Sequence, residues 1–221
     1  FPNHHPDPSI PENLADLQAA VRQHRADIGL AFDGDADRLG VVTDAGEIIW
    51  PDRVLMPLAE EVLLQHPGAA VVYDVKCSRH LTRLIERLGG QPILWKTGHS
   101  LIKAKMRETG ALLGGEMTGH FVHADDWFGF DDAFYAAARL LRLLARRGVS
   151  SAEFFAAWPT GPNTPELRLD MAEGEPFAFM ARLAARADFG PDARLITLDG
   201  LRVEFPHGWG LVRASNTTPS L

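Results

Sequence analysis

Short apolar segments alternate with amphipathic helical segments between residues 70 and 116. Three segments are predicted strands and two are predicted helices, and the first helix ends at a Gly-Gly pair. Consecutive parallel strands need a crossover connection of about a dozen residues, usually a helix, which this spacing provides. The sequence therefore predicts a parallel sheet with helices packed against it. The predicted strands are 70–75, 93–96 and 112–116, and the predicted helices are 78–88 and 101–109.

A different pattern follows residues 159–165. This segment contains three prolines, a glycine and an asparagine, which is the composition of a linker. After it come short strands and one helix, a small α+β pattern. We therefore predict an α/β chain in which a parallel-sheet unit is followed by a small α+β unit. Outside the alternation, the predicted helices are 13–25, 52–65, 131–147 and 177–187, and the predicted strands are 27–32, 39–43, 47–50, 195–197, 201–205 and 210–212, with another near residue 167.

The longest predicted helix spans residues 131–147. Apolar residues recur along it at the spacing of one helical face. We expect this face to point toward the core. Its members are Phe134, Ala138, Leu141 and Leu144.

The composition excludes several classes of protein. The chain of 221 residues is 46% hydrophobic and 23% charged, unlike a wholly disordered or collagen-like chain. Its longest apolar run, Ala133 to Ala138, has six residues, too few to span a membrane. Its single cysteine, Cys77, excludes an intrachain disulfide and a four-thiolate zinc site. A net charge of −7 argues against nucleic-acid binding. We expect a cytoplasmic protein without nucleic-acid or membrane partners.

Charge is unevenly distributed along the chain. Residues 1–50 carry 3 basic and 9 acidic side chains, whereas residues 76–107 carry 8 basic side chains and 1 acidic one. An acidic cluster and a basic stretch in one fold suit a divalent cation bound beside an anionic ligand. We interpret four of the basic residues as solvated helix faces. They are Arg83, Arg87, Lys103 and Lys105.

Three carboxylates, Asp33, Asp35 and Asp37, follow the predicted strand 27–32. At this spacing they repel one another unless a cation lies among them, and hard oxygen ligands suit Mg²⁺ or Ca²⁺. An EF-hand loop is excluded because Arg38 stands where such a loop needs glycine. Arg38 has the side chain best suited to bidentate binding of a phosphate. A phosphatase with Asp33 as nucleophile is an alternative at this point.

A glycine-rich segment, Gly115 to His120, follows the predicted strand 112–116. Its glycines let the backbone approach a ligand, and Glu116 and Thr118 offer hydrogen-bonding groups to sugar hydroxyls. His120 has the side chain most suited to proton transfer near neutral pH. The alternative is an ordinary turn with a structural histidine.

A third polar segment follows the last predicted strand. It offers a guanidinium, hydroxyls, an amide and backbone N–H groups without any acidic residue, which suits a phosphate. An ordinary polar turn is equally compatible with this segment alone. The segment contains Arg213, Ser215, Asn216 and Thr217.

Two further residues are candidates because of where they stand in the predicted sheet. Lys76 ends the strand 70–75, where an open α/β sheet presents side chains to ligands. His99 lies at the turn between strand 93–96 and the following helix, a common position for an anion or a helix cap.

These motifs, in this order, resemble the α-D-phosphohexomutase superfamily, specifically its bacterial phosphomannomutase/phosphoglucomutase branch. The likeness extends from the segment 1–8 to the segment 213–219, so it covers nearly the whole chain. The family has four domains around a central cleft. The resemblance implies that residues 1–47 are the second half of domain 2, 48–158 are domain 3, and 159–221 are most of domain 4.

The resemblance implies reversible interconversion of a hexose 1-phosphate and a hexose 6-phosphate, with glucose or mannose as the hexose. A phosphoserine on domain 1 gives its phosphoryl group to the sugar. The product of this step is a hexose 1,6-bisphosphate, which is both intermediate and activator. It reorients in the cleft and returns its other phosphate to the serine. Phosphoryl transfer of this kind depends on charge stabilisation and in-line positioning. The resemblance thus implies a phosphosugar as partner, one Mg²⁺ per active site, and, we expect, a monomer.

The resemblance also implies a role for each matching position. Glu116, Thr118 and His120 recognise the sugar, and His120 also takes part in acid–base steps. The catalytic group comprises Arg38, Lys76, His99 and His120; the phosphate that does not react is bound by Arg213, Ser215, Asn216 and Thr217; and the metal is held by Asp33, Asp35 and Asp37.

One part of the family pattern is missing from this sequence. The family's nucleophile lies in a Thr-Ala-Ser-His-Asn-Pro type loop, and no serine here is followed by His-Asn-Pro. We therefore expect that domain 1 is absent and that these residues alone do not turn over substrate. A phosphosugar-binding remnant without catalysis and an aspartyl sugar phosphatase are the alternative functions.

Overall fold

The computed structural model describes residues 1–164, 166–216 and 218–221. The chain divides into two compact units, Phe1–Thr160 and Gly161–Leu221. The first contains a parallel-rich α/β sheet and the second a small antiparallel sheet with one helix, so the predicted fold class is confirmed. The assignment of 1–47, 48–158 and 159–221 to three separate family domains stays a prediction. Among the described residues, no helix is long and apolar enough to cross a membrane.

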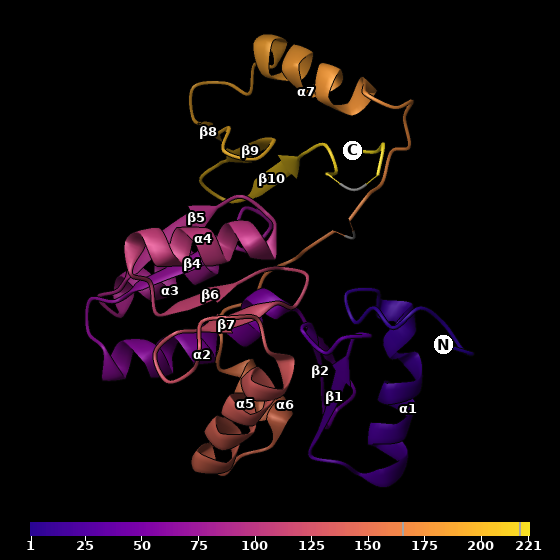
Figure 1. Cartoon of the computed structure of the whole chain (residues 1–221), viewed down its shortest axis with the longest axis vertical. Helices are drawn as coiled ribbons and strands as arrows, with labels where there is room; N and C mark the ends of the chain where they lie inside the picture. Colours follow the sequence, from indigo (N-terminus) through magenta and orange to yellow (C-terminus); the bar gives the residue numbers. More distant parts are fainter. Residues whose placement is uncertain (165, 217) are drawn as a thin grey trace. The chain divides into compact units, whose positions relative to one another are not determined.

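The central sheet of the first unit has four strands in the order β5-β4-β6-β7 (Figure 1). The strands β4 (Ala70–Asp74), β5 (Gln91–Trp95) and β6 (Leu113–Gly115) are mutually parallel, as predicted. The edge strand β7 (Phe121–His123) is antiparallel to β6 and was not predicted, because three residues are too few to show an alternating pattern.

Helices cover both faces of this sheet (Figure 1). On one face, Val72 of β4 packs against α4 (His99–Thr109). On the other face, Tyr73 belongs to the core formed with α2 (Pro51–Gln65) and α3 (Arg79–Arg87). Neighbouring residues of a strand point to opposite faces, so β4 is buried on both sides, as expected for the central strand of a parallel sheet.

A smaller antiparallel sheet occupies the N-terminal part of the first unit. Its order is β1-β2-β3, and α1 packs against β1 and β2. A single turn of 3-10 helix precedes α1 where the sequence suggested one continuous helix. The bounds are Pro11–Leu14 for the 3-10 turn, Ala15–His24 for α1, Ile28–Phe32 for β1, Leu39–Thr43 for β2 and Ile48–Ile49 for β3.

The longest helix, α5 (Ala133–Arg147), buries a different face from the predicted one. Phe134, Ala138 and Leu141 are exposed, and only Leu144 of the predicted set is buried. The ring of Phe134 instead lies against Phe32, with ring centroids 4.6 Å apart. Alanines on the buried face allow close packing against α2, which a search for large apolar residues overlooks. The buried residues are Ala133, Ala136, Ala137, Arg139, Leu140 and Leu144.

A short helix, α6 (Ser151–Ala156), follows α5 and was also not predicted. Its N-terminus is a capping box in which the Ser150 hydroxyl accepts from the Glu153 backbone N–H and the Glu153 side chain accepts from the Ser150 N–H. The Ser-x-x-Glu spacing is visible in the sequence and is a helix-start signal.

The second unit contains an antiparallel sheet in the order β10-β9-β8 and a helix. Arg202 is buried in β9, and its guanidinium lies 3.9 Å from the ring centre of Trp209. The described residues near 167 form no strand; only an isolated bridge pairs Asp170 with Ser220. The bounds are Glu175–Arg186 for α7, Arg194–Ile196 for β8, Leu201–Glu204 for β9 and Trp209–Val212 for β10.

Candidate active site in the first unit

The candidate site starts from the carboxyl ends of the three parallel strands. Lys76 lies in the turn after β4, His99 begins α4 after β5, and Glu116 directly follows β6. Parallel strands end at the same edge of a sheet, so the connections after them gather there. Three of the predicted site residues are therefore carried by one edge of the sheet.

Asp74, the last residue of β4, ties these three connections together. Its Oδ1 accepts from the Cys77 thiol at 3.1 Å and from the Met117 N–H at 3.3 Å. Its Oδ2 accepts from the Thr97 hydroxyl at 3.0 Å. The side chain is fully buried, and burial raises the pKa of Asp74. This residue was not predicted, because its partners lie in separate loops.

Glu116 lies beside this buried aspartate. Its side chain is buried and accepts a hydrogen bond from the Gly98 N–H. Burial and the neighbouring Asp74 raise the pKa of Glu116 to about 7. Glu116 therefore exchanges its proton near neutral pH, where an ordinary glutamate is ionised.

The three aspartates lie on the connection between β1 and β2. Asp33 stabilises the turn of this loop, because its Oδ1 accepts from the backbone N–H groups of Asp37 at 3.0 Å and Arg38 at 3.1 Å. One oxygen from each of Asp33, Asp35 and Asp37 lies within 4.8 Å of the others. Burial raises the pKa of Asp37, and repulsion from Asp33 and Asp35 adds to the rise. A cation among these oxygens would relieve that repulsion, so the residues fit a divalent ion.

Arg38 is held by two carboxylates. Its Nε donates to Asp33 Oδ2 at 2.7 Å, and its Nη1 lies 3.1 Å from Asp7 Oδ2. Burial opposes ionisation of Asp33, but the hydrogen bonds from Arg38 hold the pKa of Asp33 below its ordinary value. These contacts orient the guanidinium of Arg38 beside the acidic loop, the connection that carries Asp33, Asp35 and Asp37.

Backbone pairing joins the acidic loop to the glycine-rich loop. The Leu39 N–H donates to the Gly119 carbonyl at 3.0 Å, and Arg38 forms a bridge with His120. Gly119 has φ +101°, and a Cβ there would lie 2.9 Å from the Leu39 carbonyl oxygen. Glycine is therefore required at this position for both conformation and space. The pairing places His120 beside Asp37, with Nδ1 and Oδ2 3.5 Å apart.

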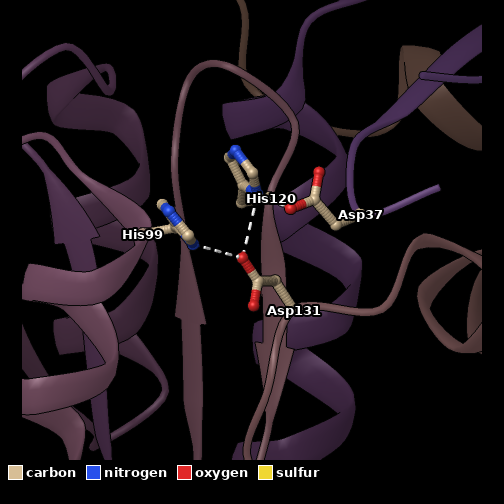
Figure 2. A group of neighbouring side chains, drawn as sticks. All are labelled: Asp37, His99, His120 and Asp131. Atoms are coloured by element: carbon tan, nitrogen blue, oxygen red, sulfur yellow. Dashed lines mark hydrogen bonds and ion pairs between the residues drawn. The ribbon is translucent and has the colours of Figure 1, made fainter. Parts of the chain in front are cut away.

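Asp131 lies between His99 and His120 (Figure 2). Its Oδ2 is 2.8 Å from His99 Nδ1 and 3.1 Å from His120 Nδ1, and its Oδ1 accepts from Lys103 Nζ at 2.5 Å. Burial opposes protonation of His120, but the carboxylates of Asp131, Asp37 and Glu116 raise its pKa. Burial likewise opposes ionisation of Asp131, but its contacts with His120 and Lys103 hold its pKa well below the ordinary value.

Two residues of this cluster differ from expectation. Asp131 was not identified, because it lies on a loop 11 positions after His120 and no spacing signals their contact. Lys103 was interpreted as part of a solvated helix face, yet its ammonium is directed at Asp131. Lys105 is also partnered, since it contacts Glu108 at 2.6 Å and lies over the ring of Trp95.

The structure brings together most of the predicted site residues of the first unit. Thr118 lies on the glycine-rich loop, and its buried Oγ1 has no hydrogen-bond partner within the described residues. A buried hydroxyl without a protein partner is available to a ligand. These residues lie on the acidic loop, on the glycine-rich loop or at His99. They are Asp33, Asp35, Asp37, Arg38, His99, Glu116, Thr118 and His120.

The predicted phosphate-binding residues lie in the second unit. Arg213 Nη2 contacts Asp199 Oδ2 at 3.2 Å, an ion pair the sequence did not suggest. The Ser215 hydroxyl accepts from the Thr218 N–H at 3.2 Å, and Asn216 is exposed. Thr217 lies outside the described residues.

Comparison with protein families matches the first unit twice. Residues 50–160 match the family described as phosphoglucomutase/phosphomannomutase, alpha/beta/alpha domain III. Residues 1–46 match the description of alpha/beta/alpha domain II of the same family. The first match covers half of the chain.

Individual relatives and solved structures agree with these matches. The chain is 56% identical over 221 residues to a phosphomannomutase/phosphoglucomutase of Pseudomonas putida and 55% identical over 222 residues to a phosphoglucomutase of Neisseria gonorrhoeae. Both alignments cover 100% of this chain, which spans 48% of each relative's length. A crystal structure of a phosphoglucomutase/phosphomannomutase family protein from Burkholderia thailandensis matches with a TM-score of 0.93 at 55% identity, covering 100% of this chain and 46% of that one. The chain belongs to the phosphoglucomutase/phosphomannomutase family.

Proposed function

We propose that the protein containing this chain interconverts hexose 1-phosphate and hexose 6-phosphate, with glucose or mannose as the hexose. The reaction passes through a hexose 1,6-bisphosphate and a phosphoserine form of the enzyme. Family membership supports the reaction class. The observation that carries the proposal is the pairing of the acidic loop with the glycine-rich loop, which brings the carboxylate of Asp37 beside His120.

The acidic loop is the proposed metal site. Asp33, Asp35 and Asp37 would hold one Mg²⁺ through carboxylate oxygens, the ligands this ion prefers. Bound Mg²⁺ supplies positive charge that stabilises the phosphoryl group during transfer. Arg38, already oriented by Asp33 and Asp7, adds a second positive group beside the same loop.

The other predicted residues are assigned to sugar and phosphate. We assign Glu116 and Thr118 to the sugar hydroxyls, since one is a buried carboxylate and the other a buried hydroxyl without a partner within the described residues. His120 moves a proton at the reacting hydroxyl, and His99 and Lys76 contribute to the same site. The phosphate that does not react is bound by Arg213, Ser215, Asn216 and Thr217.

The phosphoserine belongs to a part of the protein outside these 221 residues. The chain spans about half the length of the relatives it matches, and none of its serines is followed by His-Asn-Pro. We therefore propose that the chain alone binds substrate but does not turn it over. We further propose that the whole protein is a cytoplasmic monomer.

The contacts of Asp33 argue against an aspartyl phosphatase. Oδ1 accepts two backbone N–H groups, and Oδ2 accepts the Arg38 Nε–H at 2.7 Å. A nucleophilic carboxylate needs an oxygen free to attack phosphorus. The surroundings of Asp33 instead suit a residue that organises a loop and contributes to a metal site.

The test follows glucose 1-phosphate and mannose 1-phosphate by phosphorus NMR, using the full-length protein with Mg²⁺ and hexose 1,6-bisphosphate. We expect conversion to the 6-phosphates, no conversion by the 221-residue chain, and a loss of about 10²–10³ in kcat for Asp35→Asn. Asp27→Asn, an exposed change of the same kind, is the matched control. Release of inorganic phosphate would contradict the proposal in favour of a phosphatase, and binding without conversion would favour a remnant.

A further inference from the structure

Asp74 is a buried acidic residue within the candidate site that no step of the proposed reaction uses. It ends β4, the strand that lies between β5 and β6 in the sheet. Its side chain is fully buried, and its two oxygens accept hydrogen bonds from three separate loops. The donors are Cys77 after β4, Thr97 after β5 and Met117 after β6. The central position of β4 brings all three within reach of one side chain.

The donor after β6 lies between the two residues assigned to the sugar hydroxyls. Met117 follows Glu116 and precedes Thr118, and its backbone N–H donates to Asp74 Oδ1 at 3.3 Å. A hydrogen bond to this N–H restrains the peptide plane between two neighbouring side chains, and therefore the directions in which both of them leave the backbone. Asp74 thus holds the sugar-binding pair through the residue between them.

The loop after β5 is held by the other oxygen of the same side chain. The Thr97 hydroxyl donates to Asp74 Oδ2 at 3.0 Å. The next residue, Gly98, donates its backbone N–H to the side chain of Glu116. The loops after β5 and β6 are thus connected twice, once through Asp74 and once directly. Loss of the Thr97 contact would release Gly98 and, with it, the hydrogen bond that orients Glu116.

The burial of Asp74 separates its effect on loop geometry from its effect on stability. Burial of a carboxyl group opposes folding, and hydrogen bonds are needed to offset it. The same burial raises the pKa of Asp74. An apolar, β-branched residue would end a central parallel strand without this cost. Asp74 therefore contributes more to the arrangement of the loops than to the stability of the sheet.

We propose that Asp74 is a positioning residue for sugar recognition, which holds Glu116 and Thr118 in the arrangement that binds the hexose hydroxyls. The identity of the ligand rests on the proposed function, whereas the coupling of the two loops does not. These two side chains are assigned to recognition rather than to the reacting hydroxyl. Their displacement therefore weakens binding of the substrate and of the transition state alike. The expected signature is a rise in KM with little change in kcat.

The first test measures the coupling between the loops in the 221-residue chain, by amide hydrogen exchange followed with NMR. Thr97→Val removes the hydroxyl at nearly constant shape, and Thr97→Ser, which keeps it, is the matched control. Without the Thr97 donor the side chain of Asp74 is less restrained. We therefore expect the Met117 amide to exchange about 5- to 30-fold faster in Thr97→Val and at the wild-type rate in Thr97→Ser.

The amides of α5, which lie outside these loops, serve as the internal reference for this test. Their exchange rates should be the same in all three proteins. An unchanged rate for Met117 in Thr97→Val would show that Asp74 does not connect the two loops. Equal acceleration of Met117 and α5 would show only a general loss of stability. Either result would overturn the proposal.

The second test measures the kinetics of the full-length protein with glucose 1-phosphate. Asp74→Val removes both oxygens, whereas Asp74→Asn keeps one that accepts from Met117 and is the matched control. We expect Asp74→Val to raise KM about 10-fold or more, with kcat within about threefold, and Asp74→Asn to raise KM less than about threefold. In a Glu116→Ala background, Asp74→Val should change KM less than about twofold, because the two residues act as a unit.

A purely structural role for Asp74 predicts a different outcome. Asp74→Val would then lower the melting temperature without changing KM, or would raise KM equally in both backgrounds, and either result would contradict the positioning role. If Asp74→Val does not fold, Thr97→Val and Thr97→Ser provide the same kinetic comparison. If the Met117 amide responds as expected but the full-length protein converts no sugar phosphate, the proposed function fails and the coupling of the two loops stands.

Discussion

Two histidines of this fold lie three positions apart, each beside an aspartate, and their pKa values are shifted in opposite directions. His120 Nδ1 lies 3.1 Å from Asp131, and His123 Nδ1 lies 3.4 Å from Asp125. The surroundings raise the pKa of His120 above its ordinary value. Burial and the charge of Arg139 lower the pKa of His123, although Asp125 opposes this.

The difference lies in what else surrounds each ring, because both aspartates contact a cation: Asp131 contacts Lys103 and Asp125 contacts Arg139. Asp125 is 2.9 Å from Arg139 Nη2, and that guanidinium also lies 2.7 Å from Glu61. The charge of Arg139 therefore opposes protonation of His123, which burial also disfavours. His120 is surrounded by three carboxylates and is 13% exposed, whereas His123 is 1% exposed.

The surroundings of His120 thus favour binding of a proton, whereas those of His123 disfavour it. Several carboxylates around an imidazole raise its pKa, whereas deep burial and a neighbouring cation lower it. The acidic loop and the loops around His99 and His120 carry an excess of negative charge, which a bound proton or metal ion would reduce. The network of α2, α5 and the β7 loop is internally balanced and contributes to stability.

The largest effect is expected in the balanced network. Arg139→Leu leaves Glu61 and Asp125 without their buried cation, and we expect a loss of about 3–5 kcal/mol in the free energy of unfolding. Arg142→Leu is the matched control, since Arg142 contacts the same glutamate at 2.8 Å from a partly exposed position. It should cost less than about 1 kcal/mol. If urea unfolding gave the same loss of stability for Arg139→Leu and Arg142→Leu, Arg139 would not be the cation that compensates Glu61 and Asp125.

The next effect concerns the proton on Glu116. Its pKa is about 7 in the folded protein against 4.5 ordinarily, so the folded state keeps a proton that the unfolded state loses. The free energy of unfolding should therefore fall as pH rises from about 4.5 through about 7. Glu116→Gln should remove about 1–3 kcal/mol of this decline. Glu86→Gln, an exposed change, is the control. An unchanged pH profile for Glu116→Gln would mean that Glu116 titrates as an ordinary glutamate.

An effect of comparable size is expected where the two loops meet. Gly119→Ala places a Cβ 2.9 Å from the Leu39 carbonyl oxygen at φ +101°, and we expect a loss of about 2–3 kcal/mol. Gly129→Ala has a similar positive φ of 77° but meets only the Ala124 Cβ, at 3.8 Å. It should cost about 1 kcal/mol. Comparable thermal shifts for the two variants would argue that the close approach to Leu39 is unimportant.

The sequence predicts the parallel sheet well, because its apolar strands and amphipathic helices alternate strictly. It fails for β7 and for the buried face of α5, where the strand is short and small alanines rather than large residues meet the core. These features depend on tertiary packing, which local patterns do not encode.

The acidic and glycine-rich loops could be identified from residue type and spacing. Asp74, Lys103 and Asp131 could not, because each acts through contacts between separate loops. His123 was not among the predicted site residues, and it is buried. Nothing in the sequence shows that Arg139 neutralises the aspartate beside it.

The most direct test of this account is the titration of the His120 and His123 ring protons in one NMR experiment, without and with Mg²⁺. Without the ion, we expect His120 to titrate above the ordinary imidazole pKa and His123 below it. Mg²⁺ held by the acidic loop would neutralise Asp37, so it should lower the pKa of His120 and leave that of His123 unchanged. Equal titration of the two rings, or a His120 that does not respond to Mg²⁺, would contradict the claim that the two loops form one charged site.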